Sequence, residues 1–312
     1  FYCKLHDDVL PHPEACLVTG ISPQIANEKC LLEPDFINKV NQQFSTPQTC
    51  VVGYNNIRFD DEFTRHLLYR NFFDPYAREW KSGNSRWDLI DVVRMTYALR
   101  PEGINWPVRD GNLPTFKLEE LTKANGITHE SAHDALSDVY ATIALAKLIK
   151  QKQPKLFAWG YALRNKKKAS ELLDIINHTT VLHISGKYPA SQKCLGVVCP
   201  LVQHPINKNA IIVVDLSADP TDLINLTSGE IYKKLYTATA DLKEGEERIP
   251  LKAVHLNKSP MLAPLNTLND TVKDELDIDL SQCEINRQAI LQASIINKIS
   301  DVFSINEFEP SS

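Results

Sequence analysis

The sequence predicts an α/β domain followed by a β-rich domain that a helix closes. Three observations predict this order. Residues 1–152 combine a short β-branched run with several segments of helical period. Beyond Pro154 the pattern changes to short β-type runs separated by turn residues. The length of 312 residues exceeds that of most single domains, so we expect two, at 1–152 and 153–312.

The first residues of the chain are typical of strands and turns. Residues 1–4 resemble the end of a strand, and because no turn or helix start comes before them, we expect further strands upstream. Residues 17–23 predict a turn and then a helix, with Ser22 as the N-cap and Pro23 in the first position. Residues 49–54 are rich in β-branched side chains and predict a short buried strand.

Four further helices are predicted from apolar spacing, at 61–73, 89–99, 116–125 and 135–150. Pro101 ends the second of these, and Gly126 suits the C′ position of the third. The helix at 135–150 has the strongest pattern. Its apolar residues predict one buried face, formed by Leu136, Val139, Tyr140, Ile143 and Leu148.

The second domain is predicted to be a small β-barrel or sandwich. Residues 181–184 and 210–214 are β-type runs, and turn residues recur at short intervals. An amphipathic helix at about 286–303 is expected to close the domain.

Composition narrows the class of protein. A net charge of −5 argues against a protein that coats nucleic acid nonspecifically, although carboxylates that bind cations also count as negative. No apolar stretch is long enough for a membrane helix, so we expect a cytoplasmic protein without membrane contact. The seven cysteines include no C-x-x-C pair, and Cys194 and Cys199 are expected to be buried free thiols rather than zinc ligands.

Two short motifs carry the chemistry. One is Asn56-Ile57-Arg58-Phe59-Asp60, and the other is His133-Asp134-Ala135-Leu136-Ser137-Asp138. Each aspartate alone could simply cap the helix that follows. Together and in this order they resemble the second and third motifs of the DEDD exonuclease superfamily, N-x-x-F-D and H-x-A-x-x-D. This resemblance implies that Asp60 and Asp138 bind metal ions and that His133 is the general base.

These residue types suit phosphodiester hydrolysis. The reaction needs a hydroxide at neutral pH and positive charge near the attacking and leaving oxygens, which two divalent ions supply. Magnesium prefers hard oxygen ligands and keeps several waters, so a few carboxylates suffice. We therefore expect Mg²⁺, with Mn²⁺ as an alternative. A histidine with an ordinary pKa near 6.5 can accept a proton from water at physiological pH.

Longer segments resemble one family within that superfamily. Residues 54–62, 84–89, 99–107, 121–127 and 255–258 are similar to exodeoxyribonuclease I. The resemblance implies an RNase H-like exonuclease domain, with a mixed sheet flanked by helices, followed by an SH3-like domain. It also implies processive 3′ to 5′ degradation of single-stranded DNA to 5′-mononucleotides, in DNA repair and recombination. The expected protein is a monomer, with single-stranded DNA-binding protein as a further candidate partner.

The sequence departs from the family pattern in two places. The family begins with a strand that carries D-x-E and ends with a helical domain, and neither is found in these 312 residues. We therefore expect a fragment with impaired metal binding. Asp60-Asp61-Glu62 spells D-x-E, but it stands where the second motif belongs. Asp88 and Asp91 form a D-x-x-D that is an alternative metal pair, although Asp88 also suits a helix start.

A single strand is held by stacking on aromatic rings and by cations near its phosphates. Phe116 and Lys117 are the leading candidates, because a ring and a cation stand together at a predicted helix start. Other candidates are Arg65, expected to face out of its helix, and Tyr76, Trp80, Arg94, Lys166, Lys252 and Asn257. Each of these could instead belong to the core or to a solvated surface. Two other functions stay open: a module that binds DNA without cutting it, and an exonuclease that acts on RNA.

Overall fold

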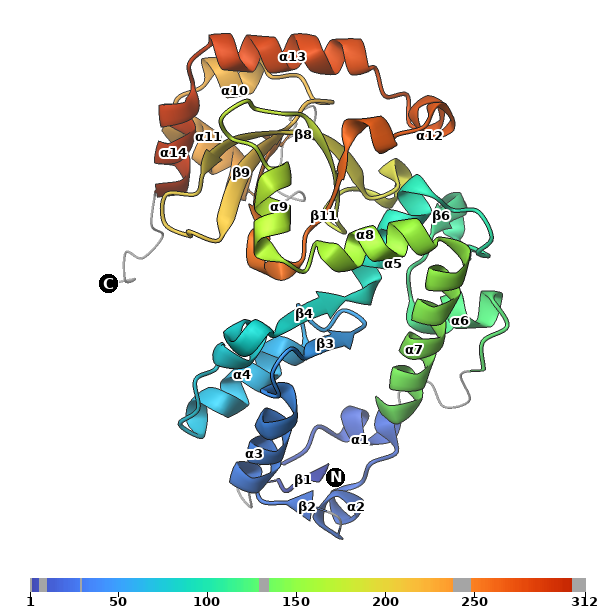
Figure 1. Ribbon diagram of the computed structural model, residues 1–312. Coiled ribbons are helices and arrows are strands. Elements are labelled where there is room, and N and C mark those ends of the chain that lie inside the picture. Colours follow the sequence, from blue (N-terminus) through green and yellow to red (C-terminus); the bar gives the residue numbers. More distant parts are fainter. Residues whose placement is uncertain (1, 6–9, 29, 129–134, 238–247, 305–312) are drawn as a thin grey trace. The chain divides into compact units, whose positions relative to one another are not determined.

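The structure is a computed structural model that describes residues 2–5, 10–28, 30–128, 135–237 and 248–304. Its contacts divide the chain into two compact units (Figure 1). The first unit comprises residues 1–93 and 101–161, and the second comprises residues 94–100 and 162–312. The predicted boundary at residue 152 coincides with the end of a helix, whereas the units divide slightly later, after Tyr161. No helix in the described ranges is long and apolar enough to cross a bilayer.

The first unit combines short strand pairs with helices. Its elements are β1 (Tyr2–Cys3), α1 (Pro13–Thr19), α2 (Pro23–Glu28), β2 (Cys30–Leu31), α3 (Glu33–Phe44), β3 (Cys50–Gly53), α4 (Asp60–Arg70), η1 (Ala77–Glu79), η2 (Lys81–Gly83), β4 (Ser85–Asp88), the start of α5 (Leu89–Leu99), β5 (Val108–Arg109), η3 (Asp110–Asn112), β6 (Leu113–Pro114), α6 (Leu118–Ala124), α7 (Ala135–Lys152) and α8 (Pro154–Ala162). Strands β3 and β4 pair in parallel, with Gly53 opposite Asp88 at their carboxyl ends. Strands β1 and β2 are also parallel, and β5 and β6 are antiparallel.

Most predicted elements of this unit are confirmed. The strand at 49–54 and the helix at 89–99 correspond to β3 and α5, and α6 ends just before Gly126, whose φ is +64°. The predicted burial of the strand is wrong, because Val52 is exposed and the other residues of β3 are half-buried. The turn predicted at 17–19 is wrong, because these residues form the end of α1. Both signals for that helix are present in the sequence, since Pro13 is its first residue and Gly20 ends it with φ +68°.

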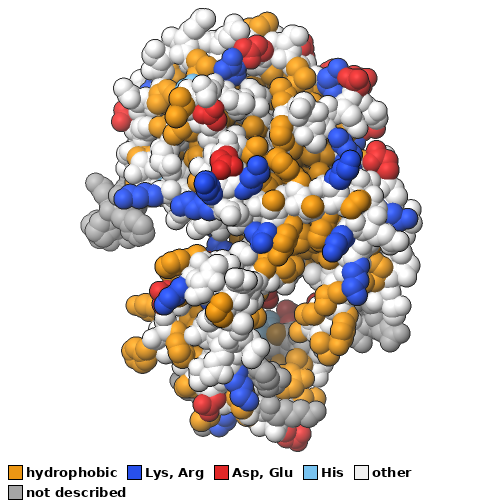
Figure 2. Space-filling view, in the orientation of Figure 1, with side chains coloured by type: hydrophobic (Ala, Val, Ile, Leu, Met, Phe, Trp, Pro, Cys, Tyr) orange, Lys and Arg blue, Asp and Glu red, His pale blue; other side chains and the backbone are white. Residues whose placement is uncertain are grey.

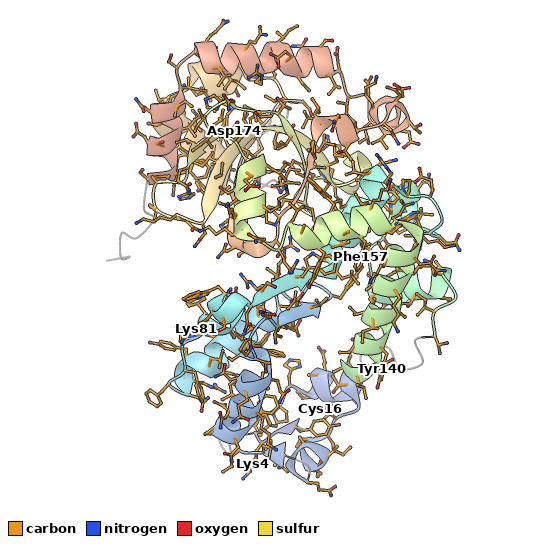
Figure 3. All side chains as sticks on the ribbon, in the orientation of Figure 1. Lys4, Cys16, Lys81, Tyr140, Phe157 and Asp174 are labelled. Atoms are coloured by element: carbon orange, nitrogen blue, oxygen red, sulfur yellow. The ribbon has the colours of Figure 1, made fainter. Side chains whose placement is uncertain are left out.

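The buried face predicted for α7 is also wrong. Leu136, Val139, Tyr140 and Ile143 are exposed, and the buried residues are Ala141, Thr142, Leu145 and Ile149. Figure 3 labels Tyr140 near the first turn of α7. The helix is apolar around much of its circumference, so spacing alone does not decide which side packs.

Trp87 anchors β4 in the core of the first unit. Its indole N–H donates to the carbonyl of Gly160 at 3.0 Å. The rings of Phe157 and Tyr161 meet it edge-on, each with a centroid separation of 5.2 Å. All three partners lie on α8, where Figure 3 labels Phe157. The end of β4, which carries Asp88, is therefore fixed to a helix far along the sequence.

The second unit is built on one antiparallel sheet, in the order β10-β9-β8-β7-β11. Its elements are the last turns of α5, α9 (Lys166–Leu172), β7 (Val181–Ile184), η4 (Ala190–Gln192), β8 (Leu195–Gln203), β9 (Ala210–Asp215), α10 (Thr221–Asn225), α11 (Ser228–Tyr236), β10 (Leu251–His255), η6 (Leu256–Lys258), β11 (Met261–Pro264), η7 (Leu265–Thr267), α12 (Asp270–Glu275), α13 (Leu280–Gln292) and α14 (Ile296–Ser304). The β-rich prediction is confirmed. Figure 2 shows acidic and basic side chains interspersed on the visible face of this unit.

The closing helix of the second unit differs from the prediction. Two helices, α13 and α14, replace the single helix expected at 286–303. Ser294 stands between them with φ +52°, a left-handed conformation that ends a helix. All seven cysteines are free, and Cys194 and Cys199 are buried as expected. Burial raises the pKa of Cys199 to about 12, so its thiol stays protonated.

Candidate active site

The second-motif residues form a tight turn between β3 and α4. Asn55 enters the turn with φ +65°, a conformation that asparagine tolerates better than most residues. The carbonyl of Asn56 accepts hydrogen bonds from the N–H groups of Phe59 at 3.3 Å and Asp61 at 2.9 Å. Gly53 leaves room for this turn, since a Cβ there would lie 2.7 Å from the Cβ of Asn56. The turn thus leads directly into α4, of which Asp60 is the first residue.

Asp60 and Asp61 are adjacent but have different partners. Asp61 is 2% exposed and accepts hydrogen bonds from Arg78 at 2.8 Å and from Arg86 at 2.9 Å. Asp60 is exposed, and within the described ranges no cation pairs with its carboxylate. Of the two, Asp60 is therefore the residue available to a metal ion.

Glu62 and Arg65 neutralise each other on the next turn of α4. The Arg65 guanidinium donates to Glu62 at 2.5 Å and twice to Glu79 at 2.8 Å. Its side chain is 12% exposed, so the prediction that Arg65 faces outward is wrong. The cause is η1, which places Glu79 against this face of α4. A displaced D-x-E motif at residues 60–62 is not supported, because Glu62 already has a cationic partner.

The electrostatic surroundings of Asp60 favour cation binding. Although Asp60 is exposed by surface area, nearby protein atoms partly desolvate its carboxylate and raise its pKa above the ordinary value, and the negative charge of Asp61 raises the pKa further. A carboxylate in this situation is stabilised in its charged form by a nearby cation. Its oxygen donors are of the type that Mg²⁺ and Mn²⁺ prefer.

The third motif is described only in part. His133 and Asp134 lie outside the described residues. Asp138 lies in the first turn of α7, as predicted from the sequence. It is half-buried, and its carbonyl accepts a hydrogen bond from the Thr142 hydroxyl at 2.8 Å. In the described ranges no group of three His, Cys, Asp or Glu side chains could hold a metal ion. The carboxylates of Asp60 and Asp138 fit a divalent ion in donor type, and their joint role stays a prediction.

Phe116 and Lys117 are brought next to the second-motif turn. The hydroxyl of Tyr54, which follows β3, donates to the carbonyl of Phe116 at 2.5 Å. Phe116 is half-buried, whereas the Lys117 side chain is 67% exposed and lies 3.6 Å from Glu120. An ion pair this exposed is weak. The ammonium of Lys117 is therefore held only weakly by Glu120.

Tyr76 and Trp80 are both exposed in the first unit. The Arg65 guanidinium lies over the Tyr76 ring, with its Cζ atom 5.0 Å from the ring centroid. Trp80 stands between η1 and η2. Whether either ring stacks on a base stays a prediction.

Two of the other candidates in the second unit are held by neighbours. Arg94 lies on the part of α5 that belongs to this unit, and its guanidinium packs so closely that a Cβ on Gly186 would be 2.8 Å away. The ammonium of Lys252 lies 3.0 Å from the ring centroid of Tyr188. Burial lowers the pKa of Lys252 to about 8. Both cations are thus part of the packing of this unit.

Lys166 and Asn257 are the exposed candidates of the second unit. Lys166 donates to the side-chain oxygen of Asn209 at 2.6 Å, and Asn257 lies in η6. Their contact with DNA stays a prediction.

Asp88 and Asp91 have a role that sequence reasoning missed. Asp88 accepts hydrogen bonds from the backbone N–H groups of Asn55 at 2.7 Å and of Ile57 at 3.2 Å. Asp91 pairs with Arg58 at 3.2 Å. The D-x-x-D pattern was visible, but only the pairing of β3 with β4 shows which loop it faces. The alternative of a metal pair is not supported, because the carboxylate oxygens already have partners.

Comparison with known proteins gives a consistent result over both units. A family model described as an exonuclease matches residues 1–146, and the exonuclease I SH3-like domain model matches residues 164–305. Exodeoxyribonuclease I of Buchnera aphidicola subsp. Acyrthosiphon pisum is 40% identical over 98% of this chain and 73% of its own length. The chain belongs to the exodeoxyribonuclease I family.

Other members of the exodeoxyribonuclease I family are similar to this chain in sequence and in structure. The Haemophilus influenzae enzyme is 52% identical over 97% of this chain, and the chain spans 65% of that protein's length. The Escherichia coli exonuclease I complex with a dA16 oligonucleotide matches with a TM-score of 0.93 and 47% identity, over 99% of this chain and 66% of that one. The zinc-bound form of the E. coli enzyme with single-stranded DNA also gives 0.93, with 48% identity over 100% and 66% of the two chains. The predicted order of an RNase H-like exonuclease domain and an SH3-like domain is thereby confirmed.

Proposed function

We propose that this protein removes nucleotides from the 3′ end of single-stranded DNA and releases 5′-mononucleotides. The observation that carries the proposal is the match, over nearly the whole chain, to exonuclease I bound to a single-stranded oligonucleotide. The accessible carboxylate of Asp60, which no described cation neutralises, supports it. The same proposal includes a role in DNA repair and recombination and a cytoplasmic location. It also includes a monomeric state and contact with single-stranded DNA-binding protein.

The residues of this chain would divide the work among them. Asp60 and Asp138 would hold Mg²⁺ or Mn²⁺, and such ions supply a more acidic water and positive charge near the phosphate. His133 would accept the proton of the attacking water. Phe116 would stack on a base, and Lys117 would face a phosphate.

The experiment that tests this proposal follows nucleotide release from a 3′-tailed oligonucleotide. When the chain is extended by the upstream D-x-E strand that we expect from the sequence, release should occur with Mg²⁺ or Mn²⁺, be absent with EDTA, and be much slower from duplex DNA or RNA. Asp60→Asn should abolish release, because it removes a negative ligand from the metal site. The matched control is Glu62→Gln, two residues away, whose carboxylate is bound to Arg65 and should be dispensable. Release that survives in Asp60→Asn, or that proceeds in EDTA, would contradict the proposal.

A further inference from the structure

We propose that Asp88 is a positioning residue, which holds the turn between β3 and α4 in the shape that presents Asp60 to its metal ion. The inference rests on the proposed function. Asp88 itself would touch neither metal nor DNA. Its part is to fix the backbone of a loop that belongs to the neighbouring strand.

The position of Asp88 follows from the sheet. Strands β3 and β4 run parallel, and Asp88 pairs with Gly53 at the last position of both. The chain after Gly53 therefore passes directly in front of the Asp88 carboxylate. One oxygen accepts from the N–H of Asn55 at 2.7 Å, and the other accepts from the N–H of Ile57 at 3.2 Å. The carboxylate thus bridges two alternate residues of the turn.

The turn needs such a support from outside. Asn55 is held with a positive φ, which costs a non-glycine residue conformational energy. The Asn56 side chain lies so close to Gly53 that a methyl group would not fit between them. Within the turn, the N–H groups of Asn55 and Ile57 point to Asp88 rather than to the turn itself. Loss of the carboxylate would leave both donors unsatisfied, and Ile57 is buried.

The same carboxylate also ties the turn to α5. Its first oxygen accepts a third hydrogen bond from the N–H of Ile90 at 3.2 Å, in the first turn of that helix. Three residues along, Asp91 pairs with Arg58 of the motif. Asp88 is 1% exposed, so neither water nor a metal ion reaches it readily. Its placement suits a structural acceptor and excludes a role as a metal ligand.

Two variants and a matched control test the proposal. Asp88→Ala removes the acceptor, and Asp88→Asn keeps one oxygen, so that a stably folded variant is available. Glu33→Ala is the control, because Glu33 is also a buried carboxylate of this unit and binds Arg70 and Asn71 at the opposite end of α4. Backbone amide exchange is measured for residues 54–61, together with kcat, KM for single-stranded DNA and the metal concentration that gives half-maximal rate.

Asp88→Ala should speed amide exchange in residues 54–61, lower kcat by about 10- to 100-fold and raise the half-maximal metal concentration. The KM for DNA should change little. Asp88→Asn should show changes in exchange, kcat and half-maximal metal concentration that are smaller than those of Asp88→Ala. Glu33→Ala should leave exchange in residues 54–61 unchanged. Equal exchange or equal loss of kcat in Asp88→Ala and Glu33→Ala would overturn the inference. If the unmodified protein releases no nucleotides, the proposed function fails, and amide exchange still decides whether Asp88 holds the turn.

Discussion

Asp61 shows what a buried charge requires in this protein. Its carboxylate is enclosed with Arg78 and Arg86, and Arg86 lies 3.3 Å from Glu79 as well. Burying these groups costs desolvation energy, which is recovered only when each charge keeps its partners. The network therefore fixes the start of α4, and among the residues that the structure describes no cation pairs with the neighbouring Asp60. Of these two adjacent aspartates, Asp61 thus stabilises the fold, whereas a role of Asp60 in metal binding is the proposal made above.

The pKa of Asp88 leads to a prediction about stability. Burial and the nearby charge of Asp91 raise this pKa from 3.8 to about 6. Because the folded pKa is higher than the unfolded one, the stability that comes from protonation of Asp88 is fully present below about pH 4 and is lost as pH rises through about 6. A shift of two units corresponds to about 3 kcal/mol. Asp88→Asn cannot ionise, so its free energy of unfolding relative to the unmodified protein should increase by up to that amount between pH 4 and pH 7.

Urea unfolding of both proteins at several pH values between 4 and 7 measures this difference. A difference that stays constant over the range would show that Asp88 ionises in the folded protein as it does in the unfolded chain.

At the scale of elements, the sequence predicted those strands and helix ends that depend on the residues at the position itself. The β-branched run gave β3, Pro101 marked the end of α5, and Gly126 marked the end of α6. Other features depend on contacts from elsewhere in the chain. The packed side of α7 is one example, since both sides of its first half carry apolar residues. The break at Ser294 is another, because a serine in the left-handed region carries no strong sequence signal.

The corrected orientation of α7 predicts unequal costs for one substitution. Leu145 is 1% exposed and Leu136 is 58% exposed on the same helix. Leu145→Ala should lower the free energy of unfolding by about 2–5 kcal/mol, because it leaves a cavity in the core. Leu136→Ala should change it by less than about 1 kcal/mol. Chemical unfolding of the two variants compares them directly. Equal losses would mean that the side of α7 predicted from spacing is packed after all.

For the molecule as a whole, sequence located the motif that supplies Asp60 but not the groups that surround it. The motif is local, so five residues reveal it. Asp61 binds Arg78, Arg65 binds Glu79, and Asp88 binds the turn before α4. Only the fold brings these groups together from different elements. The net charge of the sequence is equally uninformative about where a ligand binds. A net charge of −5 gives no hint of where a DNA phosphate would be met, and that depends on single exposed cations.

Lys117 is the cation for which a phosphate contact has the clearest consequence. It lies at the start of α6, beside the turn that carries the second motif, and its exposed pairing with Glu120 at 3.6 Å is easily exchanged for a phosphate. Each phosphate contact on a single strand contributes about 0.7 to the slope of log affinity against log salt concentration. Lys117→Ala should reduce the slope by about that amount and weaken binding to all sequences alike.

The matched control is Lys123→Ala, which removes an exposed lysine near the other end of the same helix. Binding is measured by fluorescence anisotropy in EDTA, so that the oligonucleotide is not degraded. If both variants changed the slope equally, the effect would come from overall charge, and Lys117 would have no phosphate contact of its own.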